Sequence, residues 1–242
     1  MPESSPGDVS YTPMVSEEYA ERIRRWHEDA YRMAKAEAGS GEGQTFDYLG
    51  RTILVPPQVQ PITGMSHLLG EAVLKEVREN DRVLDMGTGS GVNAILAASK
   101  AAEVVAVDIN PVAVEAARNN AVYNAVADRI ALRRSDVFSN VDGEFDLIIF
   151  DPPFRWFVPR DLLEAATTDE NYRAMTTFFR EARRHLALNG RMLIFFGSSG
   201  DLNYLKHLID EEGFAAEVVA EEALVKDDWR IEYYTYRLTV VR

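Results

Sequence analysis

Apolar strands and helical segments alternate along the chain from Arg82 onward. Short continuous apolar runs are typical of buried strands, and apolar residues repeated every three or four positions are typical of helices. The expected strands are residues 82–86, 103–109, 129–135, 145–151 and 191–197. The expected helices between them are residues 92–100, 111–124 and 168–188. Buried strands separated by helices predict an α/β fold with a parallel, doubly wound sheet.

The end of the chain departs from this alternation. After an expected helix at 201–213, two apolar segments, 215–224 and 230–242, follow each other with a short acidic loop between them. A short connection favours an antiparallel pair, since parallel strands need a long crossover. We therefore expect a mixed sheet of seven strands, with the closing pair at one edge.

The first part of the chain has a different organisation. A helix is expected from Ser16 to Gly39, and residues 45–55 alternate around Gly50 like a β-hairpin. A further helix is expected over about 64–79. We divide the chain into an N-terminal extension, residues 1–62, with a loose tail over 1–13, and a core domain, residues 63–242.

Composition narrows the setting in which the protein works. The 242 residues carry a net charge of −13 and no cysteine, so disulfides and thiolate chemistry are excluded. The chain lacks a basic, apolar leader and a run of about 20 apolar residues, which predicts a cytoplasmic protein without a membrane partner. The acidic balance also disfavours a long nucleic-acid footprint. The four histidines show no metal-ligand spacing, and we expect no metal.

Three glycines alternate with other residues just after the first strand of the sheet. Residues 83–91 read VLDMGTGSG, and Gly87, Gly89 and Gly91 fall where the strand passes into a helix. Ligands of doubly wound sheets bind at such a turn, because bare backbone lets a ligand approach the amides at the positive end of the helix. The spacing G-x-G-x-G departs from the G-x-G-x-x-G of dinucleotide sites.

Acidic residues follow neighbouring strands at the same edge of the expected sheet. Asp85 precedes the glycines, where a carboxylate repels pyrophosphate and suits a positively charged amino group. Asp108 ends the second strand at a position that reaches ribose hydroxyls, and Ile109 follows it with an apolar face for adenine. Asp136 and the amide of Val137 are placed to contact the adenine edge. Together these residues predict a site for a nucleoside with a cationic amino-acid tail.

Structural alternatives exist for each of these residues. The glycines could serve only a tight turn and close helix packing. Asp85 could cap the next helix, and Asp108 could cap the helix that starts at Pro111. Asp136 could stabilise the turn after its strand.

Four motifs in order give the chain a family resemblance. The sequence D-x-G-x-G-x-G, an acid ending the second strand, an acid after the third and DPPF after the fourth resemble the class I S-adenosylmethionine-dependent methyltransferases over residues 64–242. The resemblance implies a Rossmann-like sheet and S-adenosylmethionine as cofactor. The residues it implies around that cofactor are Asp85, Gly87, Thr88, Gly89, Gly91, Asp108, Ile109, Asp136, Val137 and Asp151.

The stretch FDLIIFDPPF, residues 145–154, carries the candidate chemistry. Pro152 and Pro153 fix φ and remove two N–H donors, which leaves the carbonyls of Asp151 and Pro152 free in a rigid turn. An amide or aryl-amine nitrogen is a poor nucleophile because its lone pair is delocalised. Hydrogen bonds from its N–H groups to the Asp151 carboxylate and the Pro152 carbonyl would localise that pair and aim it at a methyl donor. Phe154 is expected to stack on a planar substrate.

The acceptor has several candidates at this point. A [D/N]-P-P-[Y/F/W] turn is similar to that of methyltransferases acting on adenine or guanine amino groups or on the glutamine of translation release factors. The glutamine enzymes usually have Asn first and Tyr last, so Asp151 and Phe154 favour a nucleobase. The motif VLDMGTGSG, the segment VPPQVQP and the N-terminal helical segment resemble the arrangement of the glutamine methyltransferases, and the acidic charge disfavours a nucleic-acid substrate. A small molecule stays a third candidate, and oligomeric state is undetermined.

Residues 155–168 follow the turn and are expected to overhang the site. Trp156, Phe157, Arg155 and Arg160 could form an aromatic and basic lip that holds substrate. In the alternative, the two aromatic side chains pack beneath the next helix and the arginines are solvated.

Overall fold

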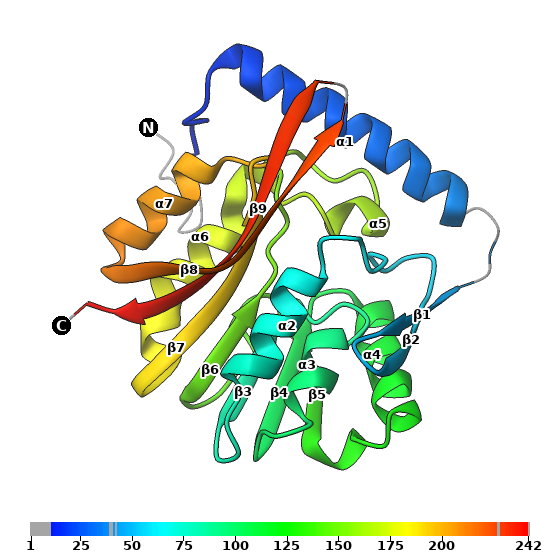
Figure 1. Cartoon of the computed structure of the whole chain (residues 1–242), viewed down its shortest axis with the longest axis vertical. Coiled ribbons are helices and arrows are strands. Elements are labelled where there is room, and N and C mark those ends of the chain that lie inside the picture. The colour runs from blue at the N-terminus through cyan, green and yellow to red at the C-terminus, as the bar shows by residue number, and fades with distance from the viewer. Residues whose placement is uncertain (1–10, 39–40, 42, 227, 242) are drawn as a thin grey trace, which may run out of the picture.

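A seven-stranded mixed sheet forms the centre of the computed structural model, which describes residues 11–38, 41, 43–226 and 228–241 (Figure 1). Its strands are β3 (Arg82–Met86), β4 (Glu103–Asp108), β5 (Ile130–Arg134), β6 (Phe145–Phe150), β7 (Leu186–Gly197), β8 (Phe214–Lys226) and β9 (Trp229–Val240). They lie in the order β5-β4-β3-β6-β7-β9-β8, and β9 is antiparallel to both of its neighbours. The predicted α/β fold and mixed closing edge are therefore confirmed.

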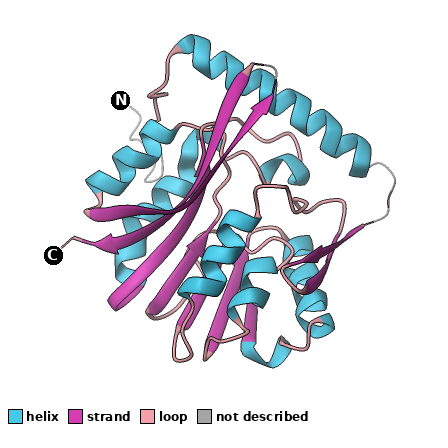
Figure 2. Ribbon diagram, viewed as in Figure 1, coloured by secondary structure: helices cyan, strands magenta, loops and turns pink. Residues whose placement is uncertain are grey.

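Helices cover both faces of this sheet (Figure 2). On one side lie α2 (His67–Glu76), α3 (Val92–Ala97) and α4 (Pro111–Tyr123), and on the other α6 (Arg173–Ala182) and α7 (Leu202–Glu211). Local sequence fixes several starts: Pro111 occupies the first turn of α4 behind Asn110, whose side chain accepts a hydrogen bond from the Val112 amide. Asp201 caps α7 in the same way through Tyr204.

One predicted helix differs from the structure. The expected helix 168–188 is broken into short 3₁₀ turns, Glu170–Tyr172 and Arg183–His185, on either side of α6. A short helix α5 (Leu162–Ala165) precedes it. Strand β7 already begins at Leu186 because the chain pairs with Phe145 there, across a register shift. Helical spacing in the sequence could not reveal this early strand pairing.

The N-terminal region follows its expected elements. Helix α1 (Glu17–Ala38) begins after Ser16, whose hydroxyl accepts a hydrogen bond from the Tyr19 amide. Strands β1 (Gln44–Tyr48) and β2 (Arg51–Val55) form the expected hairpin. Figure 1 shows α1 reaching the tip of the long β8–β9 hairpin, where Tyr19 and Trp26 each meet Trp229 edge to face.

The extension and the core domain share one hydrophobic core. Ile23, Ile53, Val55 and Val59 are buried in the same cluster as the sheet. The division at residue 62 stays a prediction, since buried side chains from both sides of it belong to the same core. Residues 1–10 of the expected tail lie outside the described residues, whereas the ring of Tyr11 packs among aromatic side chains of the core and differs from a loose segment. Within the described ranges, no helix has the length and apolar character needed to cross a bilayer.

Candidate functional site

The strand register brings the predicted site residues to one edge of the sheet. Met86 at the end of β3 pairs with Val107 of β4 and with Phe150 of β6, and Asp108 pairs with Arg134 of β5. The residues that follow these four strand ends therefore lie side by side. They are the glycine turn, Asp108 itself, Asp136 and Asp151.

The three glycines meet two different demands. All have positive φ, at 67°, 54° and 86° for Gly87, Gly89 and Gly91, so each adopts a backbone that other residues disfavour. A Cβ on Gly91 would lie 2.9 Å from Ala117 of α4, which supports the packing alternative there. At Gly87 and Gly89 the nearest atoms would be 3.8 and 3.9 Å away. These are ordinary van der Waals distances, so close packing does not explain those two glycines, and Gly87 is exposed.

Asp85 is buried at the base of the turn. Its Oδ2 accepts hydrogen bonds from the Thr88 hydroxyl at 2.6 Å and from the Ala94 amide in the first turn of α3 at 3.0 Å. The capping alternative is thus present, although Gly91 occupies the N-cap position itself. Burial raises the pKa of this carboxyl to about 7, against the opposing effect of those hydrogen bonds. A nearby cation would favour its ionised form.

Asp108 ties the glycine turn to the end of β4. Its Oδ2 accepts from the Gly89 amide at 2.9 Å, and its Oδ1 accepts from the Asn110 amide at 2.8 Å. Burial raises the pKa of Asp108, while these amide hydrogen bonds oppose the rise. The helix-capping alternative is not supported, because Asn110 caps α4. Ile109 is 51% exposed, an apolar surface beside this carboxylate.

Asp136 lies beyond β5 and is held by a residue that the sequence did not single out. Arg173 of α6 donates to its Oδ1 at 3.1 Å. The turn after β5 uses serine hydroxyls instead: Ser139 accepts from the Asp136 amide, and Ser135 donates to the Val137 carbonyl. Val137 has φ of +47°, a strained conformation for a β-branched residue and one that occurs at ligand-binding turns.

Asp151 follows β6 and opens to solvent, whereas Pro152 behind it is buried. The surrounding protein raises the pKa of Asp151 to about 7, the charge of Asp85 adds to the rise, and Arg155 opposes it. Pro153 is half-buried. The turn therefore presents an exposed aspartate beside the glycine turn, and the pKa of its carboxyl group is raised by the surrounding protein.

Phe154 packs inward. Its ring lies 4.8 Å from that of Phe196 and 5.6 Å from that of Phe195, and the residue is 8% exposed. Only a small part of this residue is accessible to a planar substrate, and stacking of the ring on such a substrate stays a prediction.

The segment 155–168 folds back against α1. Trp156 is buried, as the packing alternative expects, but it lies against Tyr11 and Tyr172 and these residues do not belong to the next helix, α5. Arg155 is buried, with its Nε lacking a hydrogen-bond partner. Arg160 pairs with Glu164 and Glu28, so neither arginine is simply solvated.

Sequence spacing missed Arg173, which is 37 residues from its partner Asp136. Its position at the start of α6 follows from the break in the expected helix, a feature without a signal in the periodicity. Ser135 and Ser139 were also missed, although a serine on each side of a strand-end acid is a turn signal that could have indicated them.

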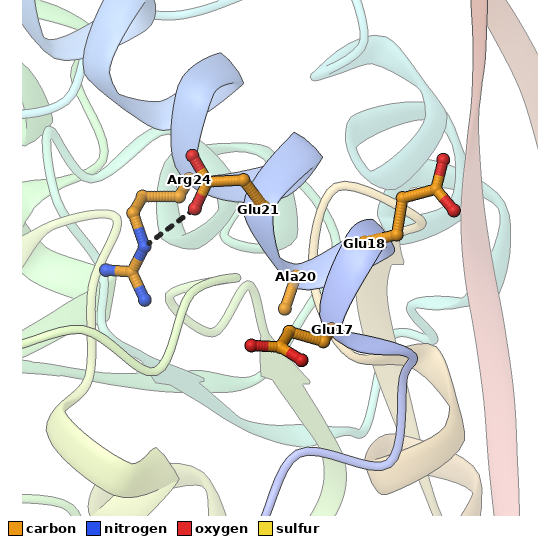
Figure 3. A pocket seen from close by; sticks show the side chains of 5 residues that line it. All are labelled: Glu17, Glu18, Ala20, Glu21 and Arg24. Carbon is orange, nitrogen blue, oxygen red and sulfur yellow. Dashed lines mark ion pairs between the residues drawn. The ribbon is translucent and has the colours of Figure 1, made fainter.

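A surface hollow on α1 is separate from this site. Figure 3 shows its lining: Glu17, Glu18, Ala20, Glu21 and Arg24, with an ion pair between the last two at 3.6 Å. None of the strand-end acids lines it. In the ranges that the structure describes, no group of three or more His, Asp or Glu side chains is arranged to hold a metal ion.

These residues fit S-adenosylmethionine. An exposed Gly87 and a half-buried Gly89, an exposed apolar residue beside Asp108, and carboxyl groups at Asp85 and Asp151 match a nucleoside that carries positive charge. The sheet order and this row of acids around a glycine turn define a class I S-adenosylmethionine-dependent methyltransferase.

The chain belongs to the methyltransferase small domain family, whose model matches residues 64–223. A relative from Methanocaldococcus jannaschii, named "Putative protein N5-glutamine methyltransferase", is 34% identical over 178 residues, which cover 65% of this chain and 85% of that protein. A ribosomal protein L11 methyltransferase of Desulfitobacterium hafniense is 42% identical over 79 residues, which cover 33% of this chain and only 25% of that enzyme.

Solved structures share the fold at low identity. A tRNA m1G37 methyltransferase of Methanocaldococcus jannaschii superposes with a TM-score of 0.61 at 19% identity, covering 83% of this chain and 57% of that chain. A ribosomal protein L11 methylase of Lactobacillus delbrueckii gives 0.55 at 19% identity, covering 80% and 97%. The confirmed conclusions are the fold, the enzyme class and the cofactor.

Proposed function

We propose that the enzyme methylates a planar amide or amino nitrogen, with a glutamine side chain of a protein as the favoured acceptor. The observation that carries this proposal is the turn after β6, where a solvent-accessible Asp151 precedes two prolines at the edge that holds the glycine turn. The relative from Methanocaldococcus jannaschii supports glutamine through its printed name. The net charge of −13 supports a protein acceptor over a nucleic acid.

The bound cofactor supplies an activated methyl group, so the protein's task is alignment. In this proposal one N–H of the acceptor donates to the Asp151 carboxylate and the other to the Pro152 carbonyl. These two acceptors localise the nitrogen lone pair and orient it in line with the methyl group.

The nitrogen gives up a proton once its new bond forms. Asp151 is positioned to take that proton, because methyl transfer removes the sulfonium charge and lets the pKa of its carboxyl group rise again toward about 7. Asp85 remains behind it and adds negative charge opposite the positively charged cofactor. In this proposal the small exposed part of Phe154 stacks on the planar acceptor.

The assignment of individual residues to parts of the cofactor belongs to the same proposal. Asp85, Thr88 and the glycine turn would surround its amino-acid part, and Asp108 its ribose. Ile109, Asp136 and Val137 would contact the adenine. The existing hydrogen bonds support this assignment, because the Gly89 amide holds the Asp108 carboxylate beside the glycine turn and Arg173 holds the Asp136 carboxylate beyond the end of β5.

A nucleobase amino group is the second candidate. It is favoured by Asp at position 151 and Phe at position 154, where glutamine enzymes of the resembling group usually carry Asn and Tyr. A carboxylate has two oxygens that accept N–H groups, whereas a carboxamide has one such oxygen and an NH2 donor. The exocyclic amine of a base offers two N–H groups to these acceptors.

Transfer of a labelled methyl group tests both candidates. The enzyme is incubated with tritiated S-adenosylmethionine and, separately, with a glutamine-rich peptide pool, total RNA and a metabolite extract. We expect label in the peptide pool. Label confined to RNA would establish the second candidate, and label confined to the metabolites would reject both macromolecular acceptors.

Asp151→Ala tests the role of the turn. We expect turnover to fall at least 1000-fold while the affinity for S-adenosylhomocysteine changes less than threefold, since the substitution removes an acceptor of the N–H group and leaves the glycine turn intact. Asp142→Ala is the matched control, because that aspartate side chain is 92% exposed. A fully active Asp151→Ala enzyme would remove this residue from the mechanism.

A further inference from the structure

A buried tyrosine from a distant segment holds the peptide that follows the DPPF turn. The Tyr172 hydroxyl donates to the Phe154 carbonyl at 2.5 Å and accepts from the Asp201 amide at 2.9 Å. Its side chain is fully buried, and its ring stacks on that of Tyr204. Burial raises the pKa of Tyr172 far above its ordinary value, so the hydroxyl keeps its proton and remains a donor.

The backbone that delivers this hydroxyl is strained. Asn171 and Tyr172 have φ of 55° and 50°, two successive non-glycine residues in the left-handed region. Such strain persists where the surroundings fix it, and it is common at functional sites. Asp169 supplies that support: its carbonyl accepts from the Tyr172 amide, and its carboxylate accepts from the amides of Ala174 and Met175.

The DPPF turn needs an external support of this kind. Pro152 and Pro153 lack N–H groups, so the turn cannot be held by amides at those positions. The Phe154 carbonyl is enclosed on its other side by Gly200, where a Cβ would lie only 2.2 Å from its oxygen. Tyr172 therefore donates to a carbonyl from which water is largely excluded. Losing that donor would leave a buried acceptor unsatisfied and the turn free to shift.

We propose that Tyr172 is a positioning residue for methyl transfer, whose hydroxyl fixes the Phe154 peptide and through it the directions of the Asp151 carboxylate and the Pro152 carbonyl. The proposal rests on the function proposed above for the turn. Tyr172 acts through the peptide and is not assigned a contact with either substrate. Displacement of reacting groups by about 1 Å is enough to lower a rate about 100-fold.

The sequence offers a direct probe of this hydrogen bond. Phe precedes Arg at Phe154–Arg155 and again at Phe179–Arg180 in α6. Protein labelled with ¹³C at the Phe carbonyl and ¹⁵N in Arg gives one NMR cross-peak for each pair. We expect Tyr172→Phe to move the Phe154–Arg155 cross-peak and to leave that of Phe179–Arg180 in place. An unmoved Phe154–Arg155 cross-peak would overturn the proposal.

Tyr204→Phe is the matched control. It removes a buried hydroxyl from the same aromatic cluster, but that hydroxyl pairs with Thr176 and does not reach the turn. With the acceptor pool that the unsubstituted enzyme methylates, we expect Tyr172→Phe to lower kcat about 10- to 100-fold. Its affinity for S-adenosylhomocysteine and the KM for the cofactor should change less than threefold. Tyr204→Phe should keep kcat within threefold.

Equal losses of kcat in the two variants, or a loss in Tyr172→Phe explained by weaker cofactor binding, would reduce Tyr172 to a packing residue and overturn the proposal. If no pool accepts methyl from the unsubstituted enzyme, the proposed function fails. The NMR result then decides the hydrogen bond by itself, since it depends on no acceptor.

Discussion

Two carboxyl groups with raised pKa values stand beside the glycine turn. Burial is the main cause for Asp85. For Asp151, an exposed residue, the cause is the surrounding protein, and the charge of Asp85 further opposes its ionisation. In the free enzyme each is partly protonated near pH 7. A cofactor with a sulfonium charge supplies the missing counter-charge, which lowers both pKa values on binding.

The affinity for S-adenosylmethionine should therefore depend on pH. A carboxyl group with a pKa of about 7 in the free enzyme must lose its proton before it can pair with the positively charged cofactor. Binding of the cofactor therefore weakens as pH falls through 7. Between pH 8 and pH 6 we expect a loss of about tenfold for each such group. Calorimetry measures the affinity and the protons released.

S-adenosylhomocysteine is the control for this effect, because it lacks the sulfonium charge. Because it keeps the amino group that Asp85 would face, its affinity should fall about tenfold over the same range, against about 100-fold for S-adenosylmethionine. Equal pH dependence for the two molecules would show that the acids do not respond to the sulfur charge.

In the absence of ligand the same groups act on stability with the opposite trend. Their pKa values are raised on folding, so their contribution to stability is largest below about pH 4 and is lost as pH rises through 7. Ligand and fold thus favour different protonation states of one pair of acids.

At the level of elements, the glycine turn connects β3 to α3 and lies against α4. Gly91 precedes α3 in the left-handed conformation, and a Cβ there would clash with Ala117 of α4, whereas a Cβ on Gly89 would make only an ordinary contact with Val59. The same residue type therefore serves packing at one position and ligand access at another, two positions apart.

Alanine substitutions separate these roles. Gly89→Ala should cost about 1 kcal/mol in unfolding free energy from backbone strain, and we expect it to weaken S-adenosylhomocysteine binding more than tenfold. Gly91→Ala should cost about 2–4 kcal/mol, because a clash with α4 adds to the strain. Urea unfolding and calorimetry measure the two effects. Equal unfolding free energies for the two variants would mean that α4 shifts to make room for the alanine side chain at position 91.

Gly50→Ala is a control for strain alone. Gly50 has φ of 76°, and a Cβ added there would have no other atom within 4 Å, far along the chain from the site. Its substitution should match Gly89→Ala in stability and leave ligand binding unchanged.

At the scale of the whole molecule, hydrogen bonds attach α1 to the segment after the DPPF turn. His27 contacts buried Glu164 at 2.7 Å, and Arg160 donates to the same carboxylate. Burial opposes ionisation of Glu164, but the hydrogen bonds from Arg160 and His27 prevail and lower its pKa to about 2. Tyr11 and Met14 bind the Asp201 carboxylate, one residue from the loop that encloses Phe154.

Glu164→Gln should loosen this attachment. The neutral side chain keeps its size but loses the charge-assisted hydrogen bonds, so we expect a loss of about 2–3 kcal/mol in unfolding free energy. Hydrogen exchange should rise in α1 and in residues 155–168 and stay low in β3. Glu18→Gln, on the exposed surface of α1, is the control. An unchanged exchange rate in α1 would mean that its apolar contacts suffice to hold it.

Much of this architecture could be predicted from the sequence. Alternation of apolar strands with helices predicted the sheet because burial on both faces requires uninterrupted apolar runs, and VLDMGTGSG with DPPF marked two of its strand ends. Burial patterns fix where residues sit along a strand, so Asp108 and Asp136 could also be placed at the ligand edge from sequence.

Contacts between distant segments were decided by the tertiary structure. Arg173 meets Asp136, Tyr172 meets Phe154, and Tyr11 meets Asp201 across separations of 37, 18 and 190 residues. Side-chain periodicity describes one element at a time and carries no information on which elements pack together. The sequence by itself determined the succession of strands along the chain and the candidate chemistry at their ends, and only the folded molecule determined which side chains hold that chemistry in place.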